Sequence, residues 1–99
     1  MLYEWDERKR QINIEKHGID FADGVKAFDG FHTTTKDSRA DYGEERFLSI
    51  GLLEGREITI IHTPRGRKTR IISMRRARTE ERKFYHEEAG KIGNGLQET

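Results

Sequence analysis

Several kinds of residue are scarce in this sequence. It contains no cysteine and one proline, and Leu, Ile, Val and Phe together account for only 21 of the 99 residues. The absence of cysteine excludes a disulfide framework and a thiolate metal site. So few apolar residues predict a thin core, but the net charge of +1 does not favour disorder. We therefore expect one small folded domain.

Long apolar runs are also missing. No segment approaches the roughly 20 apolar residues that a membrane span requires. The first six residues, MLYEWD, lack the basic and apolar regions of a signal peptide. We therefore expect a cytoplasmic protein without a membrane partner.

The signatures of metal and cofactor sites are weak. The four histidines do not recur at the spacing of a helix face, which gives little support to a zinc site. The acidic residues of 37–45 show no spacing that would bring carboxylates together around paired metal ions. The glycines are scattered rather than grouped in a phosphate-binding loop. The sequence therefore predicts neither a metal nor a cofactor.

What the chain does have is a concentrated block of positive charge. Residues 65–78 carry seven Arg and Lys and no acid, whereas residues 1–64 have a net charge of −4 and residues 79–99 a net charge of −2. A nearly neutral chain with one such block indicates a focused site for an anion.

The hydrophobic pattern predicts an α+β fold, a small antiparallel sheet packed by helices in the order β-α-α-β-β-β-β-α. Asp6 and Asp20 are expected to cap the first two helices, and Gly18 to end the first. Hairpin turns are expected at Glu54–Gly55 and at Pro64–Gly66. The predicted strands are 2–5, 31–36, 46–53, 57–63 and 68–76, and the predicted helices are 7–17, 20–28 and one that begins at 79, in a single domain over 1–89 followed by a flexible tail over 90–99.

The last predicted strand carries the strongest chemical signal. A strand needs apolar side chains on its buried face, but it does not need so many arginines. Arginines suit phosphate binding, because a guanidinium matches a phosphate with two parallel hydrogen bonds. The alternative is a solvated edge strand whose charge discourages aggregation. Arg70 and Arg75 have opposite parity, so in a regular strand they would face opposite sides of the sheet. Either a bulge redirects one of them, or only one contacts the phosphate.

Two residues near this strand are candidates for proton transfer. His62 titrates near neutral pH and lies beside the basic hairpin, although a local structural hydrogen bond explains it equally well. Tyr85 could donate a proton or stack on a base. It could also simply pack beside Phe84, and because neighbours on a helix point about 100° apart, one of the two should be more exposed.

Five short motifs occur along the chain in a characteristic order and spacing. They are Glu4-Trp5-Asp6, Lys16-His17-Gly18-Ile19 with Phe21, Asp41 to Phe47, Arg70-Ile71-Ile72-Ser73 with Arg75 and Ala77, and Glu81-Arg82 with Phe84-Tyr85. Together they resemble the BrnT toxin family, over about residues 3–88. Three features depart from the family pattern: Met74 replaces a small residue, Gly24 interrupts the second helix, and His62 stands near a strand end that is usually richer in tyrosine.

The resemblance implies a ribonuclease toxin of a type II toxin–antitoxin system, with a RelE-like fold and inhibition of translation. Its implied partners are RNA and a BrnA-like antitoxin, whose ribbon-helix-helix part binds operator DNA. We expect metal-independent cleavage through attack by the ribose 2′-OH. The alternatives are a module that binds nucleic acid or antitoxin without catalysis, and a purely regulatory subunit. The expected catalytic residues are Arg70, Arg75, Tyr85 and His62, and the expected RNA-binding residues are Lys16, His17, Arg46, Arg65, Arg67, Lys68, Ser73 and Arg76.

Overall fold

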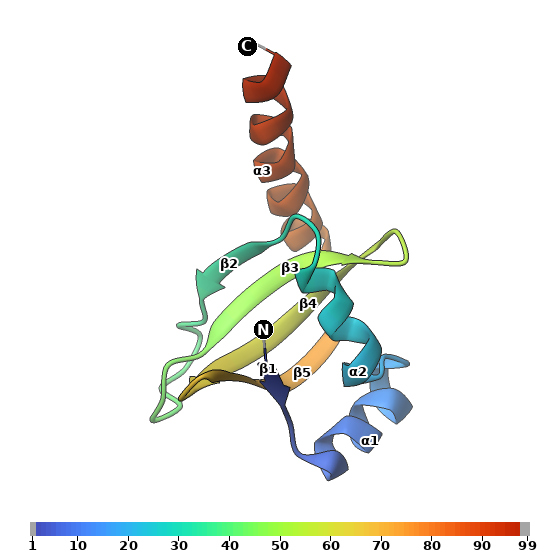
Figure 1. Cartoon of the computed structure of the whole chain (residues 1–99), viewed down its shortest axis with the longest axis vertical. Helices are drawn as coiled ribbons and strands as arrows, with labels where there is room; N and C mark the ends of the chain where they lie inside the picture. Colours follow the sequence, from blue (N-terminus) through green and yellow to red (C-terminus); the bar gives the residue numbers. More distant parts are fainter. Residues whose placement is uncertain (1, 98–99) are drawn as a thin grey trace.

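The centre of the molecule is a five-stranded sheet (Figure 1). The structure, a computed structural model, describes the backbone of residues 2–97 and the side chains of residues 2–92. Together with its helices the sheet makes an α+β fold, as predicted. The elements are β1 (Leu2–Glu4), α1 (Glu7–His17), α2 (Phe21–Gly24), the 3₁₀ helix η1 (Val25–Phe28), β2 (Thr33–Lys36), β3 (Phe47–Leu53), β4 (Arg56–Arg65), β5 (Lys68–Arg76) and α3 (Thr79–Gln97).

The sheet is mixed rather than purely antiparallel, so that part of the prediction is wrong. Its strand order is β1-β5-β4-β3-β2, and β1 pairs parallel to β5, from Leu2 opposite Lys68 to Glu4 opposite Arg70. Strands β2 to β5 are antiparallel neighbours. Short hairpins impose antiparallel pairing, but no such link joins β1 to β5, so the direction of β1 was not set by a turn.

The first helix has the predicted bounds and both predicted ends. The side chain of Asp6 accepts a hydrogen bond from the Lys9 amide at 3.1 Å, and Gly18 adopts a left-handed conformation with φ of 71°. The second helix is shorter than predicted, since α2 ends at Gly24 and continues only as η1. Glycine is a poor helix former, and the backbone at Gly24 lies tightly against Met74, which explains the early end.

The two hairpin turns differ in how well they were predicted. Glu54 and Gly55 both have positive φ, 51° and 79°, as the expected two-residue turn requires. The second turn is Gly66-Arg67 instead of one that begins at Pro64, because β4 runs through Pro64 to Arg65. The pairing of β4 with β3 ends at His62, so Pro64 lies where β4 has become an edge strand and its missing N–H is tolerated.

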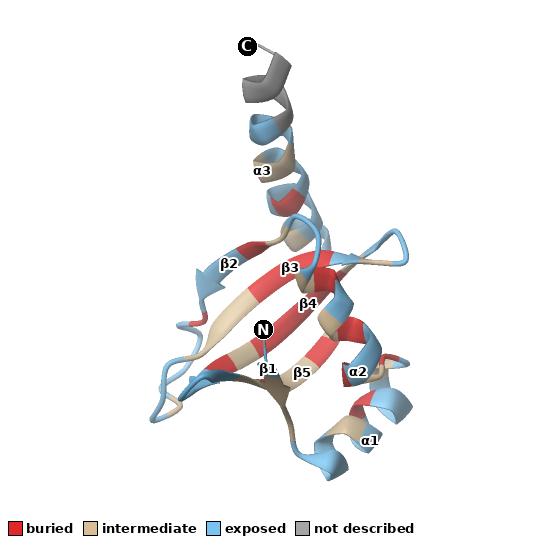
Figure 2. Ribbon diagram, in the orientation of Figure 1, coloured by how far each residue is buried: buried red, intermediate tan, exposed pale blue. Residues whose placement is uncertain are grey.

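Helices α1, α2 and η1 cover one face of the sheet, which we call the helix face (Figure 1). Between them lies the core, in which Phe21 and four strand residues, Ile58, Ile60, Ile71 and Met74, are almost fully buried. Figure 2 shows this burial as a band across the middle of β3, β4 and β5.

Helix α3 points away from the sheet and carries the C-terminus far from β1 (Figure 1). It continues to Gln97, through most of the segment 90–99 that was expected to be a flexible tail, and the last two residues of that segment lie outside the described residues. Among the described residues, no helix is both long and apolar enough to span a membrane.

Candidate active site

A bulge in β5 brings Arg70 and Arg75 to one face of the sheet. The pairing of β4 with β5 is regular down to Ser73, skips Ile72 and resumes at Ile71. The alternation of side chains along β5 therefore reverses at Ile72. Arg70, Ser73 and Arg75 consequently share one face, although their sequence positions differ in parity. Of the two arrangements that the sequence allowed, the structure has the bulge.

The buried side chains of β5 support the same reversal. Ile71 and Met74 are three residues apart, which in a regular strand would place them on opposite faces. Both are nevertheless buried in the same core cluster beneath the helices. We call the opposite face, which carries Arg70, Ser73 and Arg75, the arginine face.

Arg70 is held by a carboxylate from the N-terminal strand. Its Nη1 donates a hydrogen bond to Glu4 Oε2 at 2.6 Å, and both side chains are about 28–29% exposed. The parallel pairing of β1 with β5 places the two residues directly opposite each other. Because this contact uses one of the five N–H donors of the guanidinium, the others are free to meet a ligand from solvent.

Arg75 is held more firmly, by Glu81 in the first turns of α3. Its Nη1 and Nη2 donate to the two carboxylate oxygens of Glu81 at 2.7 and 3.0 Å. Glu81 also accepts from Thr59 Oγ1 and from the Arg78 amide. Burial alone would raise the pKa of Glu81, but these donors, above all Arg75, lower it to about 2. The carboxylate is therefore charged at neutral pH and fixes the direction of Arg75.

His17, at the end of α1, lies close enough to Arg75 to sense its charge. Burial, and after it the positive charges of Lys16 and Arg75, lower the pKa of His17. The free edge of β5 and α1 are joined by Asn13, whose Oδ1 accepts from the Met74 amide at 3.1 Å. The sequence identified Lys16 and His17 only as RNA-binding residues. In the structure His17 is half-buried at the C-terminal end of α1, and its lowered pKa leaves the imidazole neutral at pH 7.

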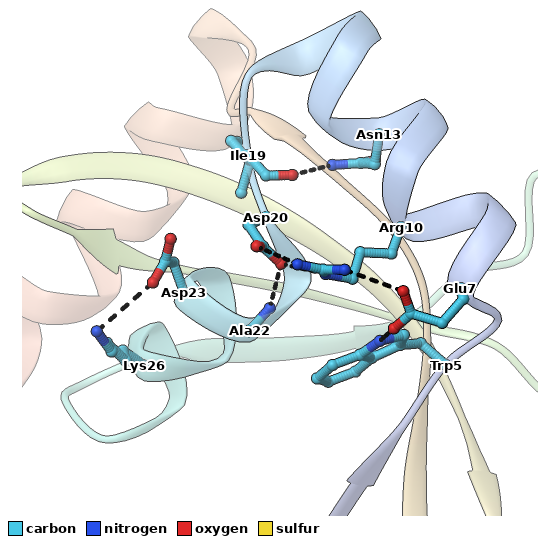
Figure 3. A network of polar contacts seen from close by, with 9 residues as sticks. All are labelled: Trp5, Glu7, Arg10, Asn13, Ile19, Asp20, Ala22, Asp23 and Lys26. Carbon is cyan, nitrogen blue, oxygen red and sulfur yellow. Dashed lines mark hydrogen bonds and ion pairs between the residues drawn. The ribbon is translucent and has the colours of Figure 1, made fainter.

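A polar network fixes α1 in this position (Figure 3). The guanidinium of Arg10 donates to both oxygens of Asp20, each at 2.8 Å, and to Glu7 at 2.9 Å. Glu7 in turn accepts from the Trp5 indole N–H at 3.1 Å. The hydrogen bond from Arg10, followed by that from the Ala22 amide, lowers the pKa of Asp20 to about 2. This network ties α1 to Trp5, the residue after β1, and to the start of α2.

His62 lies on the helix face, away from Arg70 and Arg75. It packs between the rings of Phe28 and Phe47, and its Nε2 is 2.7 Å from Ser49 Oγ. Burial, and after it the charge of His32, lower the pKa of His62 to about 4. His62 is therefore neutral at pH 7 and takes part in packing and local hydrogen bonding on the side of the sheet opposite the arginines.

Tyr85 is likewise enclosed by the fold. It is 4% exposed, whereas Phe84 is 37% exposed, so one of the pair is more exposed, as the sequence predicted. The Tyr85 hydroxyl donates to the Phe31 carbonyl oxygen at 3.2 Å, and burial raises its pKa. This hydrogen bond attaches α3 to the segment before β2.

The other expected RNA-binding residues are spread over both ends of β5. Arg46 stacks on the ring of Tyr42 at 4.1 Å and shares Glu44 with Arg65, at 3.2 and 3.8 Å. Three more stand elsewhere on the β4–β5 hairpin: Arg67 in the turn and Lys68 beside it, and Arg76 at the far end of β5.

The comparison with protein families decides which proteins this chain resembles. The family model described as the ribonuclease toxin BrnT of a type II toxin–antitoxin system matches residues 5–81. The chain belongs to the BrnT family. A comparison with curated proteins found no significant match.

The BrnT match includes most of the arginine site but begins one residue after Glu4, the partner of Arg70. It contains Lys16 and His17, the whole of β5, and Glu81, the carboxylate that holds Arg75. Tyr85 lies beyond the matched range.

Sequence reasoning did not assign a role to the carboxylates that hold the two arginines. Glu4 stands 66 positions before Arg70, a separation that no local spacing rule connects. Glu81 follows Arg75 by six residues and begins a helix, so a strand–helix turn could have suggested the contact. Both carboxylates are occupied by arginines, and no group of three His, Cys, Asp or Glu in the described part of the chain is arranged to hold a metal ion.

Proposed function

We propose that this BrnT protein is an endoribonuclease that cleaves RNA without a metal ion, through attack of the ribose 2′-OH on the adjacent phosphorus. The observation that carries the proposal is the bulge that aligns Arg70, Ser73 and Arg75 on one face. Glu4 and Glu81, the acids in contact with these arginines, are already occupied, which favours a route in which guanidinium groups neutralise the phosphate.

In the proposed reaction Arg70 and Arg75 bind the non-bridging oxygens of the scissile phosphate and stabilise the charge of the phosphorane. Neutral His17 accepts the proton of the 2′-OH, and the O2′–P bond forms as the P–O5′ bond breaks. The departing O5′ takes a proton from water or from the protonated imidazole. The products are a 2′,3′-cyclic phosphate and a 5′-hydroxyl end. Ser73 adds a hydrogen-bond donor between the two arginines.

The test is cleavage of a single-stranded RNA by the purified chain in excess EDTA, with the ends of the products identified by mass spectrometry. Wild-type protein should release 2′,3′-cyclic phosphate ends. Arg70→Ala should slow cleavage by about 10²–10³-fold, the usual loss for one charge-stabilising donor.

The matched control is Arg8→Ala, which removes an exposed arginine from α1 and leaves the arginine face intact. It should cleave at the wild-type rate, and identical preparation of the three proteins exposes any contaminating nuclease. Cleavage that is absent in EDTA and returns with magnesium would contradict the metal-free route.

Binding without catalysis is the second candidate function. It is favoured by the fact that both arginines are already paired with carboxylates, which leaves fewer donors for a transition state. In that case Arg70→Ala would weaken the affinity for RNA, and wild-type protein would show no cleavage above the level of Arg70→Ala.

The family implies an antitoxin partner, and we infer that it is BrnA-like and binds operator DNA through a ribbon-helix-helix part. The RelE-like fold and the inhibition of translation are part of the same proposal. Arrest of growth when the chain is expressed alone, relieved by the antitoxin, would support it.

A further inference from the structure

Four arginines line a cavity at the end of the sheet that the proposed cleavage site does not use. The cavity has a volume of about 410 Å³. Arg56 begins β4 and Arg76 ends β5, while Arg78 and Arg82 flank the start of α3. Two of these residues, Arg56 and Arg82, lie outside the basic block 65–78, so the chain folds to bring additional positive charge to it. We call this the arginine cavity.

No ion pair within the described part of the chain balances the charge of the four arginines in the cavity. Among the described residues, none of its four arginines forms an ion pair with a carboxylate. The acid in its lining, Glu57, is in contact with His86 Nε2 at 2.6 Å. That hydrogen bond, and to a smaller extent the charge of Arg82, lower the pKa of Glu57. Several unpaired guanidinium groups around one cavity create a positive potential that a bound anion relieves.

The arginine cavity lies next to the candidate active site. Arg75 Nη1 donates to the carbonyl oxygen of Arg76 at 3.3 Å. The Arg78 amide donates at 2.8 Å to Glu81, the same carboxylate that holds Arg75. A polyanion that has one phosphate at Arg75 therefore meets the cavity as its next contact along the surface.

We propose that the arginine cavity binds a backbone phosphate of single-stranded RNA, next to the phosphate held at Arg70 and Arg75. The identity of the polymer rests on the proposed function. The lining favours RNA over an acidic segment of a protein partner, because it consists of arginines with Glu57, Ala77 and Thr79 and offers no aromatic or large apolar anchor. Guanidinium groups suit the phosphate backbone, whatever the base sequence.

The test uses a fluorescent RNA of about ten nucleotides in which every 2′-OH is methylated. This RNA cannot be cleaved, so binding is measured apart from catalysis. Its Kd is determined by anisotropy at several salt concentrations for wild type and for Arg56→Ala/Arg82→Ala. The double variant should bind at least about tenfold more weakly. The slope of log affinity against log salt should fall by about 0.7, since one phosphate contact on a single strand contributes about 0.7 and the variant loses one such contact.

The control is Arg8→Ala/Lys26→Ala, which removes the same charge from exposed positions on α1 and η1. It should keep an affinity and a salt slope close to those of wild type. Circular dichroism should give all three proteins the same helix content, because the arginines removed from the cavity are exposed and form no ion pair with a carboxylate among the described residues. If one member of the cavity pair unfolds the protein, Arg76→Ala/Arg78→Ala provides the same measurement.

Several outcomes would overturn the inference: no binding of the RNA by wild type, equal salt slopes for the cavity variant and the control, or a loss of affinity for the antitoxin alone. Cleavage of unmodified RNA in EDTA is measured separately. Binding through the cavity without cleavage would refute the proposed function and leave the phosphate site. Cleavage with an unchanged cavity variant would refute the phosphate site only.

Discussion

The Sδ atom of Met74 occupies the space into which a side chain at Gly24 would point. A Cβ added at Gly24 would lie 2.0 Å from Met74 Sδ and 2.8 Å from its Cε. Both residues were noted in the sequence as unusual for the family that it resembles. In the structure the large residue on β5 fits because the helix above it has no side chain at position 24.

Gly24→Ala should therefore destabilise the protein, by about 1–2 kcal/mol as judged from urea unfolding. Overpacking of a core costs about 1–3 kcal/mol, and the better helix propensity of alanine offsets part of it. Gly24 has a φ of −61°, so alanine meets no backbone strain there. On a Met74→Ala background the same substitution should be neutral or stabilising.

Gly90 provides the control for this comparison of Gly24→Ala with and without Met74→Ala. An added Cβ there meets nothing within 4 Å, and the residue lies in α3. Gly90→Ala should raise stability slightly, to the same extent with either residue at position 74. Equal effects of Gly24→Ala on both backgrounds would show that Met74 is not what excludes a side chain at position 24.

The ion pair of Arg75 and Glu81 should make the fold sensitive to acid. The pKa of Glu81 is lowered from 4.5 to about 2, so the unfolded chain takes up the proton first as pH falls. The stability that this group provides is therefore complete above about pH 5 and is lost as the pH falls from about 4.5 to 2. Glu81→Gln should lower the free energy of unfolding at pH 7 by about 2 kcal/mol and flatten its pH dependence in this range.

Glu80→Gln is the neighbouring control, since Glu80 is exposed and does not contact Arg75. It should keep the wild-type pH dependence in urea unfolding followed at several pH values. Asp20 also has a pKa of about 2, so some acid sensitivity should persist in Glu81→Gln. If Glu81→Gln kept the full wild-type loss of stability, the pair would not be what holds Arg75.

The elements that depend on neighbouring residues could be predicted from sequence. Asp6 and Gly18 bound α1, and the turn at Glu54–Gly55 joins β3 and β4, because caps and tight turns are decided by a few adjacent residues. The parallel pairing of β1 could not be predicted, because it depends on β5, which lies far along the chain. Gly24 was recognised as an interruption of the second helix, but its close approach to Met74 on β5 was not.

The site shows the same division. The concentration of arginine on β5 was visible, and the parity of Arg70 and Arg75 correctly raised the question of a bulge. The carboxylates that bind the two arginines could not be predicted, since Glu4, for example, reaches Arg70 only through the pairing of β1 with β5. The sequence left open whether His62 transfers protons or forms a local structural hydrogen bond, because the face that it occupies depends on the register of β4.

The pH dependence of cleavage should identify His17 as the base. Burial and the charges of Lys16 and Arg75 lower its pKa below 6.5, so the imidazole is neutral at pH 7 and becomes protonated only in mild acid. The rate should rise with pH through a single step below pH 6.5 and then level off. His17→Gln should abolish that step and lower the rate at least about 10²-fold. The measurement is RNA cleavage in EDTA between pH 4.5 and 8.

His62→Gln and Tyr85→Phe are the comparisons for His17. His62 lies on the helix face, and the Tyr85 hydroxyl is bound to the Phe31 carbonyl oxygen, so both variants should retain the wild-type pH profile. Tyr85→Phe should lose only about 1 kcal/mol of stability, the value of one hydrogen bond to the Phe31 carbonyl. If the pH profile changed when His62 or Tyr85 was substituted but not when His17 was, our assignment of His17 as the base would be wrong.

The antitoxin should cover the basic block 65–78 with acidic groups. This segment carries seven positive charges and no acid, and the turn residue Arg67 is exposed at the tip of the β4–β5 hairpin. Hydrogen exchange of the toxin in the complex should be slowed across β5 and the β4–β5 turn. Arg67→Glu should weaken the complex, mainly through slower association, because charges at the rim of an interface steer the encounter of the partners. The difference in association rate from wild type should be largest at low salt.

The exposed Lys9→Glu on α1 makes a charge change of the same size and should leave association unchanged. A complex in which exchange across residues 65–78 stays as fast as in the free toxin would show that the antitoxin neutralises the protein from another face.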